Sequence, residues 1–157
     1  MSFYSTKINP LDVLISCLVR NRDNWTCRRC KRVYLPPTST LHCAHIFSRG
    51  DSSTRYDQDN CLALCLHCHQ WAHGHSYAFV DFVNAELGAE KVEMLRFKSQ
   101  QAVRKSQMDY NLLKLAAMQE IDKLQGVKRT WWVPDQYEVY REMNFNETMR
   151  RSKKAQT

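Results

Sequence analysis

The chain is short and basic, and its composition excludes several classes of protein. It has 157 residues, of which 43% are hydrophobic and 25% are charged, as in an ordinary soluble globular protein. No stretch approaches the ~20 apolar residues that a membrane span needs, and residues 1–20 contain no signal-peptide cleavage pattern. We therefore expect a cytoplasmic protein without a membrane partner. The formal net charge of +7 favours an anionic partner such as nucleic acid, although a merely soluble basic protein would look the same.

The first predicted element is a helix over residues 10–22. Its apolar residues recur at spacings of three and four, which places them on one helix face. These residues are Leu11, Leu14, Ile15 and Leu18. The overlapping segment 20–32 contains six basic residues and one acidic residue, so it offers positive charge for a phosphate backbone.

The middle of the chain holds nearly all of the cysteine and histidine. Of seven cysteines and six histidines, all but Cys17 lie between Cys27 and His75. Short strands are expected over residues 33–35, 41–47 and 61–64, a polar loop over 48–60, and a helix over 67–73 that Gly74 ends. In a chain without a secretion signal, this crowding indicates metal ligands rather than disulfide bonds.

The rest of the chain is predicted to be helical, in three segments. Residues 76–88, 89–104 and 109–125 carry apolar stripes at helical spacing, which we expect to form an internal core. The fold class is therefore α+β. The expected division is an N-terminal helix and metal-binding core over 1–75, a helical extension over 76–130, and a basic, partly disordered tail over 131–157.

Two Cys-x-x-Cys pairs predict a structural zinc site. Cys27 and Cys30 form the first pair, Cys65 and Cys68 the second, and 34 residues separate them. A two-residue gap lets both thiolates of a pair reach one ion, and two pairs complete a tetrahedron. Such a site has no open position, so its Zn²⁺ would hold the fold together rather than catalyse a reaction.

Histidines around this zinc site suggest hydrolysis of a phosphodiester. His69 and His73 are four residues apart on the predicted short helix, so they can grip one divalent cation, and His45 on the preceding strand can lie beside them. A neutral imidazole suits a general base, and a cation stabilises the departing oxygen. Asn60 is placed to orient the base through a backbone or ring contact.

With these residues the sequence resembles the HNH nucleases, whose ββα-metal motif is often embedded between two zinc knuckles. The resemblance implies His45 as general base, Asn60 as the orienting residue, and His69 as a catalytic residue that binds, with His73, a divalent Mg²⁺, Mn²⁺ or Zn²⁺ ion. Phage NinG-type recombination proteins look closer still, over roughly residues 10–105. The matching segments are Leu18–Asp23, Cys43–Arg49, Thr54–Asp57, Asp59–Asn60 and Leu64–Cys68.

The sequence departs from the HNH pattern immediately before the general base. Many members of the family have an acidic metal ligand there, whereas this chain has Ala44. Asp57, Asp59 or His42 could supply the missing third ligand. Asp57 is our first choice, because the segment around it recurs in the NinG-type proteins.

Three functions compete at this point. The first is a metal-dependent DNA endonuclease of phage recombination, acting in the host cytoplasm on DNA that includes branched intermediates. In it, Arg28, Arg29, Arg49 and Arg55 would contact phosphates, because guanidinium binds phosphate in a fork. The second is a non-catalytic, zinc-stabilised DNA-binding protein, which Ala44 favours. The third is an adaptor whose helices over 76–125 dock a partner. A homodimer through residues 109–125 is a further expectation.

Overall fold

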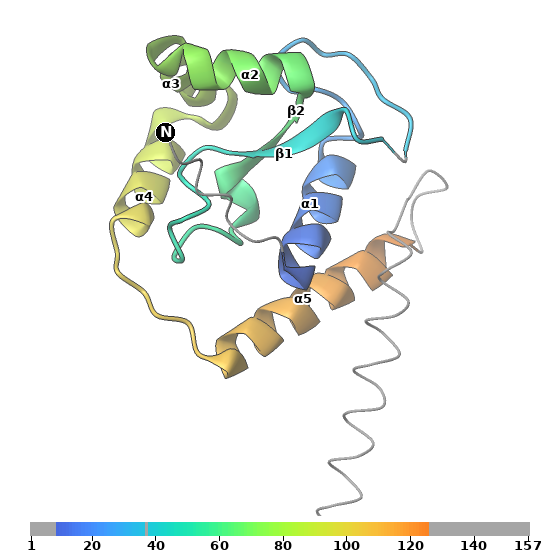
Figure 1. Cartoon of the computed structure of the whole chain (residues 1–157), viewed down its shortest axis with the longest axis vertical. Helices are drawn as coiled ribbons and strands as arrows, with labels where there is room; N and C mark the ends of the chain where they lie inside the picture. The colour runs from blue at the N-terminus through green and yellow to red at the C-terminus, as the bar shows by residue number, and fades with distance from the viewer. Residues whose placement is uncertain (1–8, 37, 126–157) are drawn as a thin grey trace, which may run out of the picture.

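The computed structural model describes residues 9–36 and 38–125, and these form an α+β fold (Figure 1). The predicted fold class is confirmed. In chain order the elements are α1 (Pro10–Arg22), β1 (Leu41–His45), the 3-10 helix η1 (Gln58–Asn60), β2 (Cys61–Cys65), α2 (Leu66–Gly74), α3 (Ser76–Leu87), α4 (Ala89–Ser99) and α5 (Gln107–Gln125). The tail predicted over 131–157 lies outside the described residues.

Helix α1 begins where its sequence provides a complete capping box. The Asn9 side chain accepts a hydrogen bond from the Asp12 backbone, and the Asp12 carboxylate accepts one from the Asn9 backbone. Pro10 occupies the first turn, where its missing N–H is not needed. The helix buries Leu14 and Leu18 along one face, as the spacing predicted.

Strands β1 and β2 form a two-stranded antiparallel sheet, with Leu41 opposite Cys65 and His45 opposite Cys61. Strand β1 ends at His45, two residues before the predicted end, because the next backbone amides bond to Asn60 instead of to the ladder. The strand predicted over 33–35 is wrong. Val33 makes only an isolated bridge with Thr26, which closes the turn carrying the first cysteine pair.

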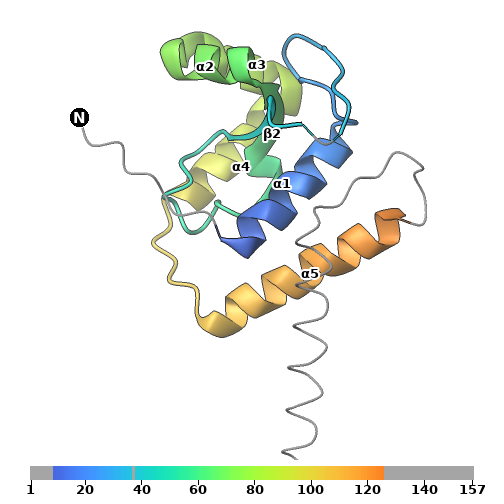
Figure 2. The ribbon, with the colours of Figure 1, turned by 45° about the vertical axis from the view of Figure 1, so that its right-hand side comes forward.

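The helices enclose this sheet in two apolar cores. One core gathers β1, β2 and the inner faces of α2, α3 and α4. The other lies between α1 and α5, where Ala117, Met118 and Ile121 of α5 pack on Leu14 and Leu18 (Figures 1 and 2). The stripe on α5 is therefore covered within one chain, which weakens the cases for a docking adaptor and for a dimer through this helix face.

Helix α4 is five residues shorter than the prediction of 89–104. It ends at Ser99, whose hydroxyl bonds the carbonyl oxygen of Arg96 and so competes for the last turn of the helix. The following segment crosses to the β1–β2 loop, where Lys105 donates to the carbonyl oxygen of Ser52. Among the described residues, no helix combines the length and the apolar character needed to cross a bilayer.

Candidate metal centre and histidine cavity

The structure brings the two Cys-x-x-Cys pairs together into one cluster. The Sγ atoms of Cys27, Cys30, Cys65 and Cys68 all lie within 4.8 Å of one another. The Cys30 and Cys65 sulfurs are 3.8 Å apart. Four sulfurs bound to a central zinc at about 2.3 Å would be spaced by about 3.8 Å, so the separation fits a tetrahedral ion. The cluster could therefore hold a structural metal such as zinc.

The surroundings of Cys65 favour its thiolate, whereas burial raises the pKa of Cys27 and Cys68, and the Cys65 sulfur also positions helix α2. Burial raises the pKa of Cys65, but hydrogen bonds from the Cys68 backbone and from Tyr34 outweigh it, so the pKa falls to about 6. The same Cys65 sulfur caps the first turn of α2 by accepting from the Cys68 backbone N–H at 3.5 Å. The next residue is His69, so the cluster fixes the start of the helix that carries the candidate catalytic histidines.

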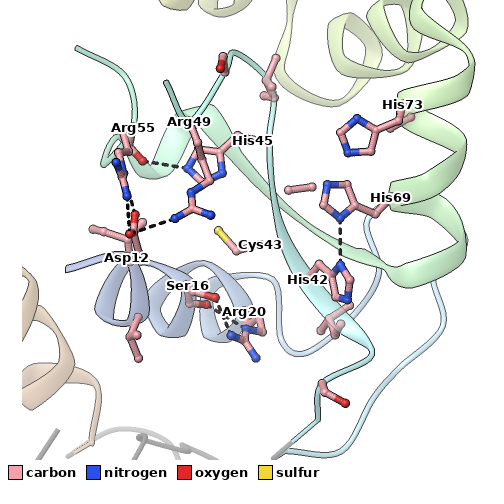
Figure 3. A pocket seen from close by; sticks show the side chains of 18 of the residues that line it. Asp12, Ser16, Arg20, His42, Cys43, His45, Arg49, Arg55, His69 and His73 are labelled. Carbon is pink, nitrogen blue, oxygen red and sulfur yellow. Dashed lines mark hydrogen bonds and ion pairs between the residues drawn. The ribbon is translucent and has the colours of Figure 1, made fainter. Parts of the chain in front are cut away.

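A cavity of about 840 Å³ lies between α1, β1 and α2 (Figure 3). All four histidines that the cavity wall contains come from β1 and α2, and two arginines come from the β1–β2 loop. They are His42, His45, His69, His73, Arg49 and Arg55. His45 lies on the α1 side of β1, whereas the other three histidines lie on the α2 side and point toward one another.

His45 is held in one orientation by the loop that follows β1. Its Nε2 lies 2.9 Å from the carbonyl oxygen of Arg55. A carbonyl oxygen only accepts, so Nε2 carries the hydrogen and Nδ1 keeps the lone pair that a general base needs. Burial lowers the pKa of His45 from its ordinary value, and the charges of Arg49 and Arg55 add to this, against opposing contributions from the Arg55 carbonyl and Asp12. The ring is therefore neutral at pH 7.

Asn60 acts on this loop, not on the histidine ring. The side chain is fully buried; its Oδ1 accepts from the Phe47 backbone N–H at 2.8 Å, and its Nδ2 donates to the carbonyl oxygens of Phe47 and Thr54, both at 3.1 Å. Thr54 immediately precedes Arg55, whose carbonyl oxygen holds His45. Asn60 was expected to make either a backbone contact or a contact with the histidine ring, and the structure has the backbone contact. Asn60 therefore affects the orientation of His45 indirectly, through the loop that contains Thr54 and Arg55.

Asp12 is a cavity residue that sequence reasoning missed. Its carboxylate accepts from Arg55 Nη2 at 2.7 Å and Nε at 3.0 Å, and from Arg49 Nη2 at 3.1 Å. Burial raises the pKa of Asp12, but the hydrogen bonds from Arg55 and the Asn9 backbone, with both arginine charges, lower it overall. The position of Asp12 in the first turn of α1 does not indicate that its carboxylate also pairs with arginines of a loop more than 35 residues away in the chain.

The three remaining cavity histidines form a compact group. His42 Nδ1 lies 3.0 Å from His69 Nδ1, and the two rings meet edge to face. His69 and His73 lie on successive turns of α2 with ring centroids 4.8 Å apart. Burial, together with the charges of the nearby His73, His42 and His45, lowers the pKa of His69 to about 4. His69 is therefore neutral at pH 7.

Several predicted site residues lie elsewhere. Asp57 caps η1 and pairs with Lys98 at 3.0 Å, and Asp59 pairs with Lys91 at 2.7 Å; neither lines the cavity that His69 lines. The structure therefore does not bring our first choice of third ligand to the histidine pair.

The four predicted phosphate contacts already have partners within the protein. Arg49 and Arg55 pair with Asp12 in the cavity wall. Arg28 pairs with Glu86 at 2.7 Å, and Arg29 donates to the Cys68 sulfur while it stacks on the Trp71 ring at 3.6 Å. Arg29 therefore contacts the cysteine cluster, Arg28 ties the first cysteine pair to α3, and neither arginine lines the cavity.

Comparisons of the chain with protein-family models, with curated proteins and with solved structures gave no match.

Proposed function

We propose that this protein is a metal-dependent DNA endonuclease of the HNH, or ββα-metal, type. The observation that carries the proposal is the composition of one cavity. Its wall combines a neutral imidazole, His45, whose Nδ1 is available, with the pair His69 and His73 at the spacing of metal ligands. The strand–strand–helix order of β1, β2 and α2 supports the same proposal. So does the cysteine cluster, which joins the segment before β1 to the junction of β2 and α2.

The proposed reaction is attack of water on the phosphorus of a DNA backbone. Nδ1 of His45 accepts the proton of the attacking water, while the bond from phosphorus to the leaving oxygen breaks. A divalent cation held by His69 and His73 would neutralise the phosphate and stabilise the leaving oxygen. Asn60 is a positioning residue in this scheme, because it holds the loop whose carbonyl oxygen orients His45.

The charge of the chain supports DNA as the substrate. The net charge is +7, and Arg49 lines the cavity with its side chain 30% exposed, within reach of an entering phosphate. Contacts of this kind provide affinity without sequence information. The resemblance to NinG-type proteins extends the proposal to phage recombination and to branched DNA.

A plasmid assay tests this proposal. Zinc-loaded protein is incubated with supercoiled plasmid and Mg²⁺, Mn²⁺ or added Zn²⁺, beside His45→Ala and the control His67→Ala, which alters an exposed histidine on the same helix as the metal pair. We expect cation-dependent nicking or linearisation that His45→Ala abolishes and His67→Ala retains. Cleavage that survives in His45→Ala would contradict the proposed base. The same assay on linear and four-way junction DNA tests branch preference.

The second candidate, a non-catalytic DNA-binding protein, is favoured by two observations. Ala44 offers no metal ligand at the position before His45, and Arg49 and Arg55 both already pair with the Asp12 carboxylate. This candidate predicts an intact plasmid under every metal condition, together with a mobility shift of DNA that weakens as salt is added.

A further inference from the structure

We infer that His42 is the third protein ligand of a three-imidazole site with His69 and His73, and that this site selects a transition-metal ion over Mg²⁺. The inference deepens the proposed function and rests on it for the catalytic role of the cation. The metal site itself is argued from the separation of His42 and His69 and from the position of His73 on the next turn of α2, and it can be tested without DNA.

The alternation of strand β1 explains why His42 can replace a ligand missing at Ala44. Side chains two residues apart in a strand point to the same face, so His42 and Ala44 both face α2, whereas His45 faces α1. Ala44 is buried and has no donor atom. His42 is the nearest residue on that face with a ligand atom, and its longer side chain reaches His69.

The separation of the two ring nitrogens matches shared coordination. Two nitrogens that bind one ion at right angles, each at about 2.1 Å, lie about 3.0 Å apart. The two Nδ1 atoms of His42 and His69 are separated by 3.0 Å. Among the described residues only the four cysteines already form a group of three or more ligands that could hold one ion, so His73 would join His42 and His69 by turning its exposed side chain.

The composition of the three-ring site determines which metal it favours. Its three donors are imidazole nitrogens, and the nearby carboxylates are engaged elsewhere: Asp12 with two arginines, Asp57 and Asp59 with lysines. Imidazole suits Zn²⁺, Ni²⁺ and similar ions, whereas Mg²⁺ requires oxygen ligands. Three nitrogens on one side of an ion leave its other positions open for water and a phosphate oxygen.

Calorimetric titration of the zinc-loaded, untagged full chain with Ni²⁺ tests the site. We expect one Ni²⁺ to bind in addition to the zinc, with no displacement by millimolar Mg²⁺. His42→Gln should weaken Ni²⁺ binding by at least about 100-fold, more than the loss of an outer-shell partner, whereas the control His67→Gln should leave it unchanged. Unchanged Ni²⁺ affinity in His42→Gln, or no Ni²⁺ binding by the wild type, overturns the inference; effective competition by Mg²⁺ overturns the selectivity.

A second measurement needs no variant and covers the case in which His42→Gln does not fold. In the wild-type protein, paramagnetic Ni²⁺ should broaden the imidazole NMR signals of His42, His69 and His73 and spare that of His67. Broadening confined to His69 and His73 overturns the inference. A protein that binds Ni²⁺ through all three rings but leaves plasmid intact would retain this site and refute the endonuclease.

Discussion

Replacing Asn60 tests two roles of this buried amide, namely its contribution to the stability of the fold and its support of the loop that orients His45. Asn60→Ala removes three hydrogen bonds of 2.8–3.1 Å and leaves the Phe47 N–H without its partner. Each bond contributes about 1 kcal/mol, and the buried Phe47 N–H left without a partner adds a further penalty. The free energy of unfolding should therefore fall by about 3–5 kcal/mol. Asn60→Asp keeps the acceptor for Phe47 but sets a second carboxylate oxygen against two carbonyl oxygens, so at pH 7 we expect a larger loss than with alanine.

The assay is urea denaturation followed by tryptophan fluorescence, at saturating zinc and from pH 7 down to about pH 5. Burial against two acceptors raises the pKa of a carboxyl group. The loss of unfolding free energy in Asn60→Asp should therefore become smaller as the pH falls, because the protonated acid again provides a hydrogen-bond donor. In DNA cleavage, both variants should lose activity even at temperatures where they remain folded, because the loop that orients His45 loosens. An aspartate variant as stable as the wild type at pH 7 would refute the hydrogen-bond network described for Asn60.

Two further predictions concern the cysteine cluster and Asp12. Cys65→Ser should lose bound zinc and the cooperative melting of the sheet and α2, because structural zinc contributes on the order of 10 kcal/mol to small folds. Circular dichroism and zinc analysis measure these two effects. The control Cys17→Ser should keep its zinc content. Because the pKa of Asp12 in the folded chain lies below the ordinary 3.8, its ionised form stabilises the fold fully above that value and less as the pH falls through the folded pKa. The stability difference between wild type and Asp12→Asn should therefore shrink in acid denaturation series, and a difference that is constant down to pH 3 would contradict the ion pair with Arg55.

The local elements were largely predictable because their signals are local. The bounds of α1 follow from a cap and a spacing that lie within the helix itself. The cysteine cluster was equally accessible, since two Cys-x-x-Cys pairs have few other uses in such a chain. The strand predicted over 33–35 is wrong because β propensity is a local signal. It does not reveal that a tight turn leaves Val33 with a single bridging partner, Thr26.

The candidate site was predictable only in part, because its residues are joined by tertiary contacts. His45, His69 and His73 followed from motif spacing, and they line one cavity. Asp12 could not be found, since no pattern within α1 indicates which loop will cover it. From the sequence we placed Asp57 before His42 as third ligand, although Asp57 lies in a loop where no alternation rule applies; alternation along β1 is the signal behind our proposal of His42.

The capping of α2 by Cys65 couples the cysteine cluster to the histidine cavity. Cys30 is the exposed member of the cluster, so peroxide reaches the sulfurs there first. With zinc in the cluster, oxidation of one sulfur would release the ion, and Cys65, whose sulfur caps the first turn of α2, would lose the bond that fixes it before His69. We therefore expect oxidation of one surface thiol to disturb imidazoles that are not themselves oxidised, and purification under reducing conditions to protect both sites at once.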